Sequence, residues 1–357
     1  MAREAIDCKK GRNRAKTAAA VTALAVFALL TLPAGIYELS RGGGVLRGGA
    51  PALEKPAATL KNSVLSGIFN VSGNPDVIVG RDGWLYYAPT LADYLEAGMI
   101  DDAGFAELGR RLEILRDYCE ARGAEFVFVC VPNKNTVYPE HMPRLYGSGA
   151  GAGGNLSRLP GLLSSAGVNG PDLRTLLTSA RNGYFAGGDP ELYYKTDTHW
   201  NAAGAAVCAD WLAAALGGSG TPYSECPAIG LASFGGDLYR LLYPYGASKR
   251  VDTEYGPGVS ADAPHFKFDK PPVSMMDMDI VTDKPSANGR LLVFRDSFGS
   301  ALVPLLSERF GHVRYLRGDA PYDFTKVESE QPDAVILILA ERNLRRLLEC
   351  DFNGVDI

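Results

Sequence analysis

Hydrophobic and polar positions along this chain alternate in the pattern of amphipathic helices followed by buried strands. Residues 103–122 have an apolar stripe at spacings of three and four, which predicts a helix. The apolar run EFVFVCV comes next and predicts a buried strand that ends at Val131. Before both, VIVGRDGWLYY has two short strand-like runs around a Gly-Arg-Asp-Gly turn, so we expect a hairpin where the folded domain begins.

The second half of the chain continues this order of helix and strand. The predicted elements are a helix over 202–216, a strand over 291–294, a helix over 301–309, strands over 312–316 and 334–339, and a helix over 341–350. Short buried strands between helices indicate an α/β domain with a largely parallel sheet. Ligands on such sheets bind at the carboxyl ends of the strands, so we expect the site in the loops after Val131 and Phe294.

An uncharged apolar run at 17–37 follows a basic N-terminal segment. A run of this length can cross a hydrocarbon core about 30 Å thick, with the basic residues on the cytoplasmic side. A cleaved signal peptide and a buried core helix are the alternatives. The sequence therefore predicts four parts: a cytoplasmic tail (1–16), a transmembrane signal anchor (17–39), a Gly/Pro-rich linker (40–72) and an extracytoplasmic catalytic domain (73–357).

Charge and cysteine content exclude two classes of function. The net charge of −5 and the pI near 5.5 leave no general basic field, so we expect no nucleic-acid partner. The six cysteines show no C-x-x-C spacing and no partnered histidines, so no metal site is predicted. Cys130 and Cys208 lie in apolar segments, where a buried free thiol is the ordinary state.

Candidate chemistry begins with Ser297, in RDSFGS, between a predicted strand and a predicted helix. This position presents a hydroxyl at the edge of the sheet, where amide groups of the next helix face developing negative charge. Ser297 could equally be a helix cap, as could Asp296 and Ser300. Position alone does not separate a nucleophile from a cap.

A serine nucleophile needs a base, and the chain has four histidines. Only His199, in YYKTDTHWN, has a carboxylate at close spacing in a segment that reads as a loop leading into a helix. Residues two apart in an extended segment point to the same side, so Asp197 can orient His199 toward Ser297. The alternative is that Asp197 or a neighbour only caps the helix that follows.

Five blocks carry a resemblance to a known family. They are, in order, GRDGWLYY, VPNKNTVYPEHMP, KTDTHWNAAGA, FRDSFGSAL and PDAVILILAERN, and they cover about residues 75 to 345. This set resembles the SGNH-hydrolase-like family of the alginate O-acetyltransferase proteins AlgX and AlgJ, together with the wider group called DHHW proteins. The resemblance implies a doubly wound α/β fold and a Ser-His-Asp triad formed by Ser297, His199 and Asp197.

The resemblance also implies the reaction and its setting. Family members are exported or membrane-anchored and attach acetyl groups to surface polysaccharides, without a cofactor. The expected partners are a polysaccharide acceptor and a membrane-bound O-acyltransferase that supplies the acyl group. Two alternatives stay open: a carbohydrate esterase or deacetylase with the same triad, and a non-catalytic polysaccharide-binding assembly protein.

Two residues depart from the family pattern, and several others are candidates for substrate contact. Arg295 stands where a Gly-Asp-Ser turn would have glycine, and Thr198 stands where many relatives have a second histidine. The candidates for the oxyanion site or the substrate are Asn133, Lys134, Arg295, Trp200 and Tyr194. Each has an alternative: a structural turn for the asparagine, solvated surface charges for the two cations, and a core position for the tryptophan.

Overall fold

The computed structural model describes residues 51–147, 154–245, 251–258, 265–318 and 322–356. The predicted tail (1–16) and transmembrane anchor (17–39) lie outside these residues. Within them, no helix is both long and apolar enough to span a bilayer. Contacts divide the chain into two compact units, Met1–Val77 with Tyr239–Lys249 and Ile78–Leu238 with Arg250–Ile357.

The first unit contains a helix where a linker was predicted. Helix α2 spans Pro51–Phe69, and its Asn62 side chain donates to the carbonyl of Leu242 at 2.6 Å. The hydroxyls of Ser66 and Tyr243 lie 2.7 Å apart. The segment is rich in Ala, Leu and Lys, which are strong helix formers, and these outweigh the prolines that suggested a linker. The linker prediction over 40–72 is therefore wrong for the residues of α2.

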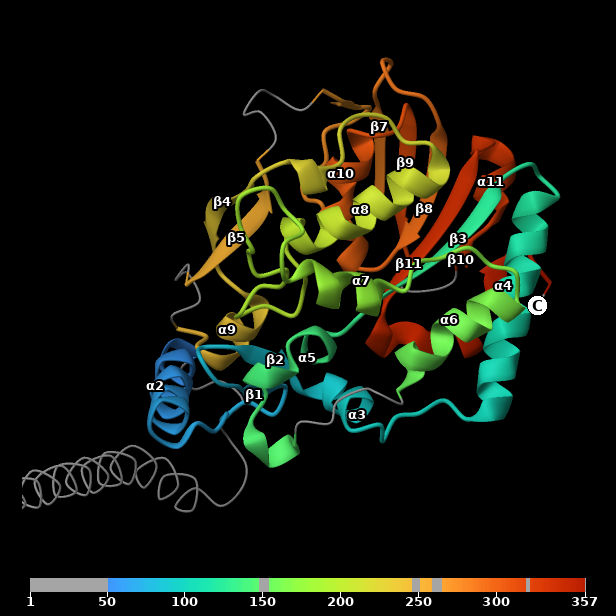
Figure 1. Cartoon of the computed structure of the whole chain (residues 1–357). Helices are drawn as coiled ribbons and strands as arrows, with labels where there is room; N and C mark the ends of the chain where they lie inside the picture. The colour runs from blue at the N-terminus through green and yellow to red at the C-terminus, as the bar shows by residue number, and fades with distance from the viewer. Residues whose placement is uncertain (1–50, 148–153, 246–250, 259–264, 319–321, 357) are drawn as a thin grey trace, which may run out of the picture. The chain divides into compact units, whose positions relative to one another are not determined.

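The second unit is built around a six-stranded sheet in the order β3-β11-β8-β9-β7-β6 (Figure 1). Its strands are β3 Glu125–Val131, β11 Ala334–Ala340, β8 Arg290–Arg295, β9 His312–Arg317, β7 Asp279–Asp283 and β6 Lys267–Phe268. The first four are parallel, as predicted, and the last two pairings are antiparallel. The sequence did not predict this antiparallel edge.

Helices cover both faces of the sheet (Figure 1). Alternate residues of each strand point to opposite sides, so each face of the sheet has apolar side chains that the helices bury. One hydrophobic core joins the strands to α7 Leu173–Ala180, α8 Ala202–Leu216 and α10 Leu302–Ser307. The other joins them to α4 Asp102–Glu120, α6 Asn155–Ser165 and α11 Thr325–Glu330. Cys130 and Cys208 are buried free thiols, as expected.

The remaining elements are short. They are β1 Val77–Val79, β2 Leu85–Tyr87, α3 Leu91–Tyr94, α5 Lys134–Val137, β4 Ala228–Phe234, α9 Asp237–Leu242, β5 Asp252–Pro257, β10 Tyr322–Asp323 and β12 Phe352–Asn353, with 3₁₀ helices η1 Ala88–Thr90, η2 Pro139–His141, η3 Arg144–Tyr146, η4 Tyr223–Glu225, η5 Phe298–Ala301 and η6 Glu341–Leu348. The predicted hairpin is present: β1 and β2 pair, and Asp82 and Gly83 have positive φ in the turn between them. The predicted final helix is 3₁₀ rather than α over 341–348.

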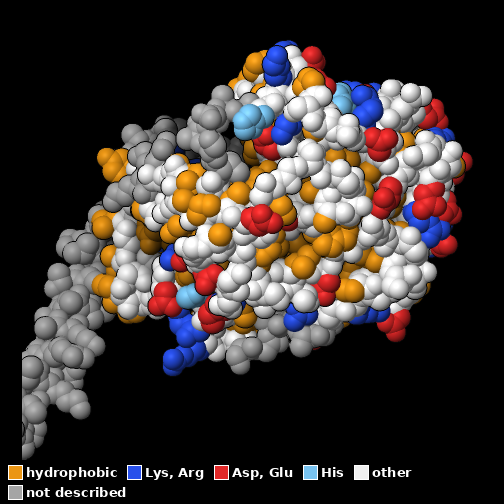
Figure 2. All heavy atoms as spheres, turned by 45° about the horizontal axis from the view of Figure 1, so that its top comes forward, with side chains coloured by type: hydrophobic (Ala, Val, Ile, Leu, Met, Phe, Trp, Pro, Cys, Tyr) orange, Lys and Arg blue, Asp and Glu red, His pale blue; other side chains and the backbone are white. Residues whose placement is uncertain are grey.

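The strand order reverses at β8, between β9 on one side and β11 on the other. After β8 the chain passes through α10 to β9 on one side, and then through α11 to β11 on the other side of β8. Such a reversal of strand order separates the loops that leave the two neighbouring strands, and ligands bind there in open α/β sheets. On the face shown in Figure 2, acidic and basic side chains are interspersed, without a broad basic field among the described residues.

Candidate active site

Ser297 lies directly after β8, in a turn that is tied to the end of β11. The carboxylate of Asp296 accepts hydrogen bonds from the main-chain N–H of Phe298 and of Ala340, both at 2.8 Å. It also accepts one from the side-chain amide of Asn343 at 2.8 Å. Asp296 is therefore the residue whose side chain caps this turn. The hydroxyl of Ser297 makes no cap hydrogen bond, so the alternative role of Ser297 as a helix cap is not needed.

The serine hydroxyl, an imidazole and a carboxylate form one hydrogen-bonded chain. Nε2 of His199 lies 2.9 Å from Oγ of Ser297, and Nδ1 lies 2.7 Å from Oδ1 of Asp197. The same Oδ1 accepts the main-chain N–H of His199 at 3.0 Å. Asn201 caps helix α8 by accepting from Gly204, so neither Asp197 nor His199 is needed as the cap. The structure therefore brings together the three residues that the sequence singled out.

Asp197 is held as a carboxylate. It is buried, and burial alone would raise its pKa, but the hydrogen bond and charge of His199 act in the opposite direction. The main-chain N–H of Asp237 adds a further hydrogen bond to Oδ2 at 2.7 Å. The net effect lowers the pKa of Asp197 to about 2. Asp197 can thus accept from His199 throughout the physiological pH range.

Asp237 is a second carboxylate beside His199, and sequence reasoning missed it. Its two oxygens accept the main-chain N–H and the hydroxyl of Thr198 at 2.8 and 2.7 Å. Oδ2 lies 3.9 Å from Nδ1 of His199. Burial and the charge of Asp197 raise the pKa of Asp237. Gly236 permits this approach, because a Cβ there would lie 1.9 Å from the carbonyl oxygen of Thr196.

Replacing Asp237 by Asn should lower acyl transfer about tenfold, which corresponds to about 1.4 kcal/mol of transition-state stabilisation. The variant keeps the main-chain N–H that binds Asp197 but removes a negative charge that favours the imidazolium. The acidic limb of the pH–rate profile should therefore move to lower pH. An unchanged profile would show that Asp237 serves only to hold Thr198.

Lys134 is not a surface charge that can hold a substrate anion. Its ammonium group is buried and donates to the carbonyls of Tyr194, Lys195 and Asp197 at 2.9, 3.0 and 2.6 Å. Burial lowers the pKa of Lys134 to about 8, and three nearby aspartates offset part of that effect. All three N–H bonds are therefore used to fix the loop that carries Asp197.

The Lys134→Met variant should lose about tenfold in acyl transfer, because three loop carbonyls lose their donor. A pH dependence should accompany this loss. Since the folded pKa of Lys134 is about 8 and the unfolded value is 10.5, the unfolded chain binds more protons between these limits, so wild-type stability should rise with pH across them. Thermal denaturation at pH 8 and 10 should show that rise weakened in the variant.

Arg295 is also committed within the fold. It is fully buried and donates to the hydroxyl of Ser300 at 2.8 Å and to the carbonyls of Met275 and Asp277 at 3.0 and 2.8 Å. Burial, and next the charge of Arg317, lower the pKa of Arg295 to about 10. The residue in the place of a family glycine therefore ties the nucleophile turn to the neighbouring loop and does not face a substrate.

The two aromatic candidates for sugar stacking are buried. Trp200 is 1% exposed, and its indole N–H donates to the carbonyl of Phe298 at 2.9 Å. Tyr194 is 7% exposed, and its ring stacks on Phe234 with centroids 4.0 Å apart. Neither ring is free to stack on a sugar, so both predictions are wrong. Trp200 instead supports the segment that follows Ser297.

Asn133 donates hydrogen bonds from both its main chain and its side chain, and its side-chain oxygen is buried. Its main-chain N–H donates to Glu341 at 2.8 Å and its amide to Asp93 at 2.9 Å. Its Oδ1 is buried without a hydrogen-bond partner among the described residues. Burial raises the pKa of Glu341 to about 7 despite the hydrogen bonds from Asn133 and Thr136. A contact between Asn133 and substrate stays a prediction.

Asp197, His199 and Asp237 each offer an atom within 4.8 Å of the others, which is a spacing that a metal ion could bridge. These atoms already bond to one another or to Thr198. A cation would have to displace hydrogen bonds that orient the imidazole. The arrangement is therefore better explained by a hydrogen-bonded network than by a metal centre, and the absence of a metal stays a prediction.

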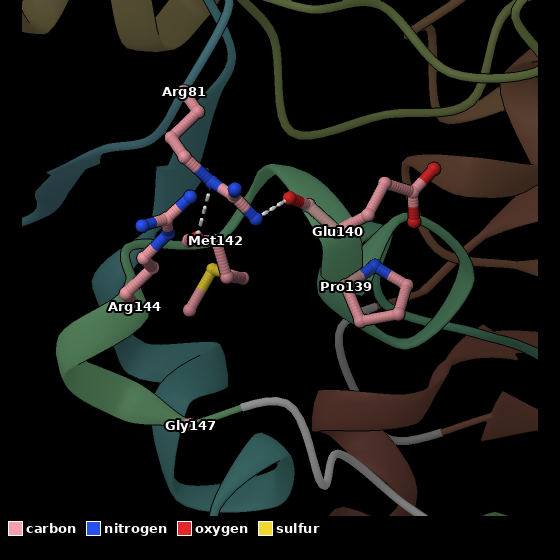
Figure 3. A pocket seen from close by; sticks show the side chains of 6 residues that line it. All are labelled: Arg81, Pro139, Glu140, Met142, Arg144 and Gly147. Atoms are coloured by element: carbon pink, nitrogen blue, oxygen red, sulfur yellow. Dashed lines mark hydrogen bonds between the residues drawn. The ribbon is translucent and has the colours of Figure 1, made fainter.

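Two pockets lie away from these residues. One, of about 410 Å³, is lined by Arg81, Pro139, Glu140, Met142, Arg144 and Gly147 (Figure 3). Its Arg81 donates to the main-chain carbonyls of Glu140 and Met142. The other, of about 570 Å³, lies between the segment around Phe266 and helix α10. None of Asp197, His199 and Ser297 lines either pocket.

The mostly parallel sheet and the Ser–His–Asp geometry are typical of an SGNH-hydrolase-like domain, and comparisons with known proteins name the same group. Residues 77–244 match the family described as "SGNH hydrolase-like domain, acetyltransferase AlgX". This match, together with relatives named AlgJ, confirms the resemblance seen in the sequence. The matched region contains Asp197 and His199 but ends before Ser297, which is assigned here by its contact with His199.

Individual relatives agree with this family. The chain is 30% identical over 181 residues to the probable alginate O-acetylase AlgJ of Pseudomonas syringae pv. tomato, covering 49% of this chain and 43% of that protein. It thus spans less than half the length of this relative. Among solved structures, Bacillus cereus PatB1 with a sulfonyl adduct gives a TM-score of 0.52 at 16% identity, covering 75% of this chain and 95% of that one. A DHHW family protein from Eubacterium siraeum gives 0.51 at 14% identity, covering 70% and 90%. These two structures show the fold alone.

Proposed function

We propose that this protein is a serine-dependent O-acetyltransferase that acts on a polysaccharide outside the cytoplasm. The single observation that carries the proposal is the hydrogen-bonded chain from Asp197 through His199 to Oγ of Ser297. The names of the relatives support the choice of acetyl group and of polysaccharide. The basic segment 1–16 and the apolar run 17–37 support a membrane anchor with the domain on the outer side.

The first half of the proposed reaction makes an acetyl-enzyme. Nε2 of His199 takes the proton of Ser297 as Oγ attacks the carbonyl carbon of the acetyl donor. The resulting oxyanion is stabilised by main-chain N–H donors that include that of Ser297. As the intermediate collapses, the bond between the carbonyl carbon and the donor breaks, and His199 returns the proton to the leaving group. Asp197 stabilises the imidazolium while it exists.

The second half transfers the acetyl group to a sugar. His199 removes the proton of a sugar hydroxyl, whose oxygen attacks the carbonyl carbon of the acetyl-enzyme. The bond to Oγ of Ser297 then breaks, and His199 gives its proton back to the serine. The acyl donor in the cell is proposed to come from a membrane-bound O-acyltransferase, because activated acetyl groups are made in the cytoplasm.

The test is to incubate the full-length chain with p-nitrophenyl acetate and an oligosaccharide, and to measure acetylated sugar and free acetate. Acetylated sugar is expected. Free acetate alone would replace the transferase proposal with an esterase that uses the same residues, and neither product would favour a non-catalytic binding protein. Adding EDTA should leave the rate unchanged, because Nδ1 of His199 is occupied by Asp197.

A further inference from the structure

Arg342 lies beside the nucleophile turn, at the first turn after β11. Its guanidinium carbon is 4.9 Å from the ring centroid of Phe298 and 5.6 Å from that of Tyr87. Phe298 directly follows Ser297, and its ring centroid is 4.8 Å from that of His199. Arg342 and His199 therefore both contact the ring of Phe298.

The guanidinium of Arg342 is half-buried and lies over two aromatic rings. Among the described residues it has no hydrogen-bond acceptor and no carboxylate within 4.0 Å. Burial lowers its pKa, although the charges of Asp296 and Asp237 act against that. Both of these carboxylates are engaged elsewhere, by the end of β11 and by Thr198. The aromatic rings offset part of the cost of withdrawing this cation from water, and an incoming anion would offset more of it.

Other buried cations of the second unit form hydrogen bonds within the fold, although Nε of Arg295 has no partner among the described residues. Lys134 donates to three carbonyls, and Arg295 donates to a hydroxyl and two carbonyls. Arg309 contacts Asp210 at 3.4 Å and the carbonyl of Ser219 at 3.2 Å. Arg342 departs from this pattern, and it does so beside Phe298, the residue that follows Ser297.

We propose that Arg342 binds a carboxylate of the acceptor sugar and thereby makes the enzyme select acidic saccharides. The inference rests on the proposed acetyl transfer and adds the residue that recognises the acceptor. A guanidinium offers two parallel N–H donors that match the two oxygens of a carboxylate. The nearby negative charges of Asp296 and Asp237 disfavour a doubly charged phosphate, so a singly charged carboxylate fits better.

The experiment compares wild type with Arg342→Gln and Arg342→Lys, using full-length protein and p-nitrophenyl acetate as donor. The acceptors are a uronate oligosaccharide and the same oligosaccharide after reduction of its carboxyl groups. Arg342→Gln should lower kcat/KM for the acidic acceptor by about 10- to 100-fold, mainly through KM, and leave the neutral acceptor within about twofold. The kcat/KM of Arg342→Lys for the acidic acceptor should lie between those of wild type and Arg342→Gln, since lysine keeps the charge but cannot donate two parallel hydrogen bonds.

Arg346→Gln is the matched control. Arg346 is exposed on the same element η6 and, unlike Arg342, does not lie over the ring of Phe298, so this variant makes the same change in charge and should behave as wild type. Equal losses for both acceptors in Arg342→Gln would overturn the proposal and assign Arg342 to the support of Phe298. No loss for either acceptor would also overturn it. Arg342→Lys serves if Arg342→Gln fails to fold.

Binding distinguishes a failure of this inference from a failure of the proposed function. Calorimetric titration of the acidic oligosaccharide into wild type and Arg342→Gln needs no acyl transfer. Weaker binding by the variant supports the acceptor subsite even if the protein proves to be an esterase. Equal binding of the acidic and neutral oligosaccharides by wild type would overturn the subsite, whatever the reaction.

Discussion

The Ser297→Ala variant should lose at least about 10³-fold in acyl transfer while it folds as wild type. The substitution removes the only atom that can carry the acetyl group in the proposed mechanism, together with the hydrogen bond to Nε2 of His199. The hydroxyl makes no cap hydrogen bond, and the turn is held by Asp296, so its loss should not disturb the fold. Acetylated oligosaccharide per enzyme is the measurement, with thermal denaturation as the check on folding.

Ser300 provides a matched control three residues further on. Its hydroxyl accepts from Arg295 at 2.8 Å and makes no contact with His199. Ser300→Ala should therefore keep acyl transfer within a few-fold of wild type, with a modest loss of stability from the unpaired arginine donor. Full activity in Ser297→Ala would refute the acetyl-enzyme mechanism. Equal loss in both variants would show that the turn, and not one hydroxyl, had been disturbed.

A serine-directed fluorophosphonate extends the comparison to chemistry without an acceptor. Wild type should be labelled faster than denatured protein, and Ser297→Ala should not be labelled above that background. Because this reaction needs only the nucleophile and its base, it reports the same site for a transferase and for an esterase. Labelling that persists in the variant would place the reactive serine elsewhere in the chain.

The sequence predicted the Asp197–His199 pair because both signals are local. Residues two apart in an extended loop share a side, and few other histidines compete. The apolar runs likewise predicted β3, β8 and β11, and Ser297 and Arg342 follow the last two of these strands. What the pattern lacked was the antiparallel edge of the sheet, since β6 and β7 are short and have no continuous apolar run.

Asp237 and Arg342 could not be found in this way, because tertiary packing alone places them. Asp237 is 40 residues from Asp197 in the sequence. Its approach requires Gly236, because a Cβ there would clash with the carbonyl oxygen of Thr196. Arg342 stands in the block PDAVILILAERN, where nothing in the sequence distinguishes it from the exposed arginines Arg345 and Arg346 that follow. Lys134 and Arg295 were predicted to contact substrate but are buried in the fold. The sequence does not show that both cations donate hydrogen bonds to main-chain carbonyls.

The Asp197→Asn variant should lose about 10²- to 10⁴-fold in acyl transfer, with a larger effect than its near-identical shape suggests. Oδ1 of Asp197 faces two N–H donors of His199, and Oδ2 faces the main-chain N–H of Asp237. An amide has one oxygen, so its NH₂ group must face one of these donors, and His199 loses its orientation or the loop loses a contact.

The stability that Asp197 contributes should depend on pH. Because the folded pKa of Asp197 is about 2 and the ordinary value is 3.8, its contribution to the free energy of unfolding is present above pH 3.8 and disappears as pH falls through about 2. Unfolding of wild type and Asp197→Asn should therefore differ most at neutral pH and converge in acid; a difference that persists in acid would show that the carboxylate charge is not the cause.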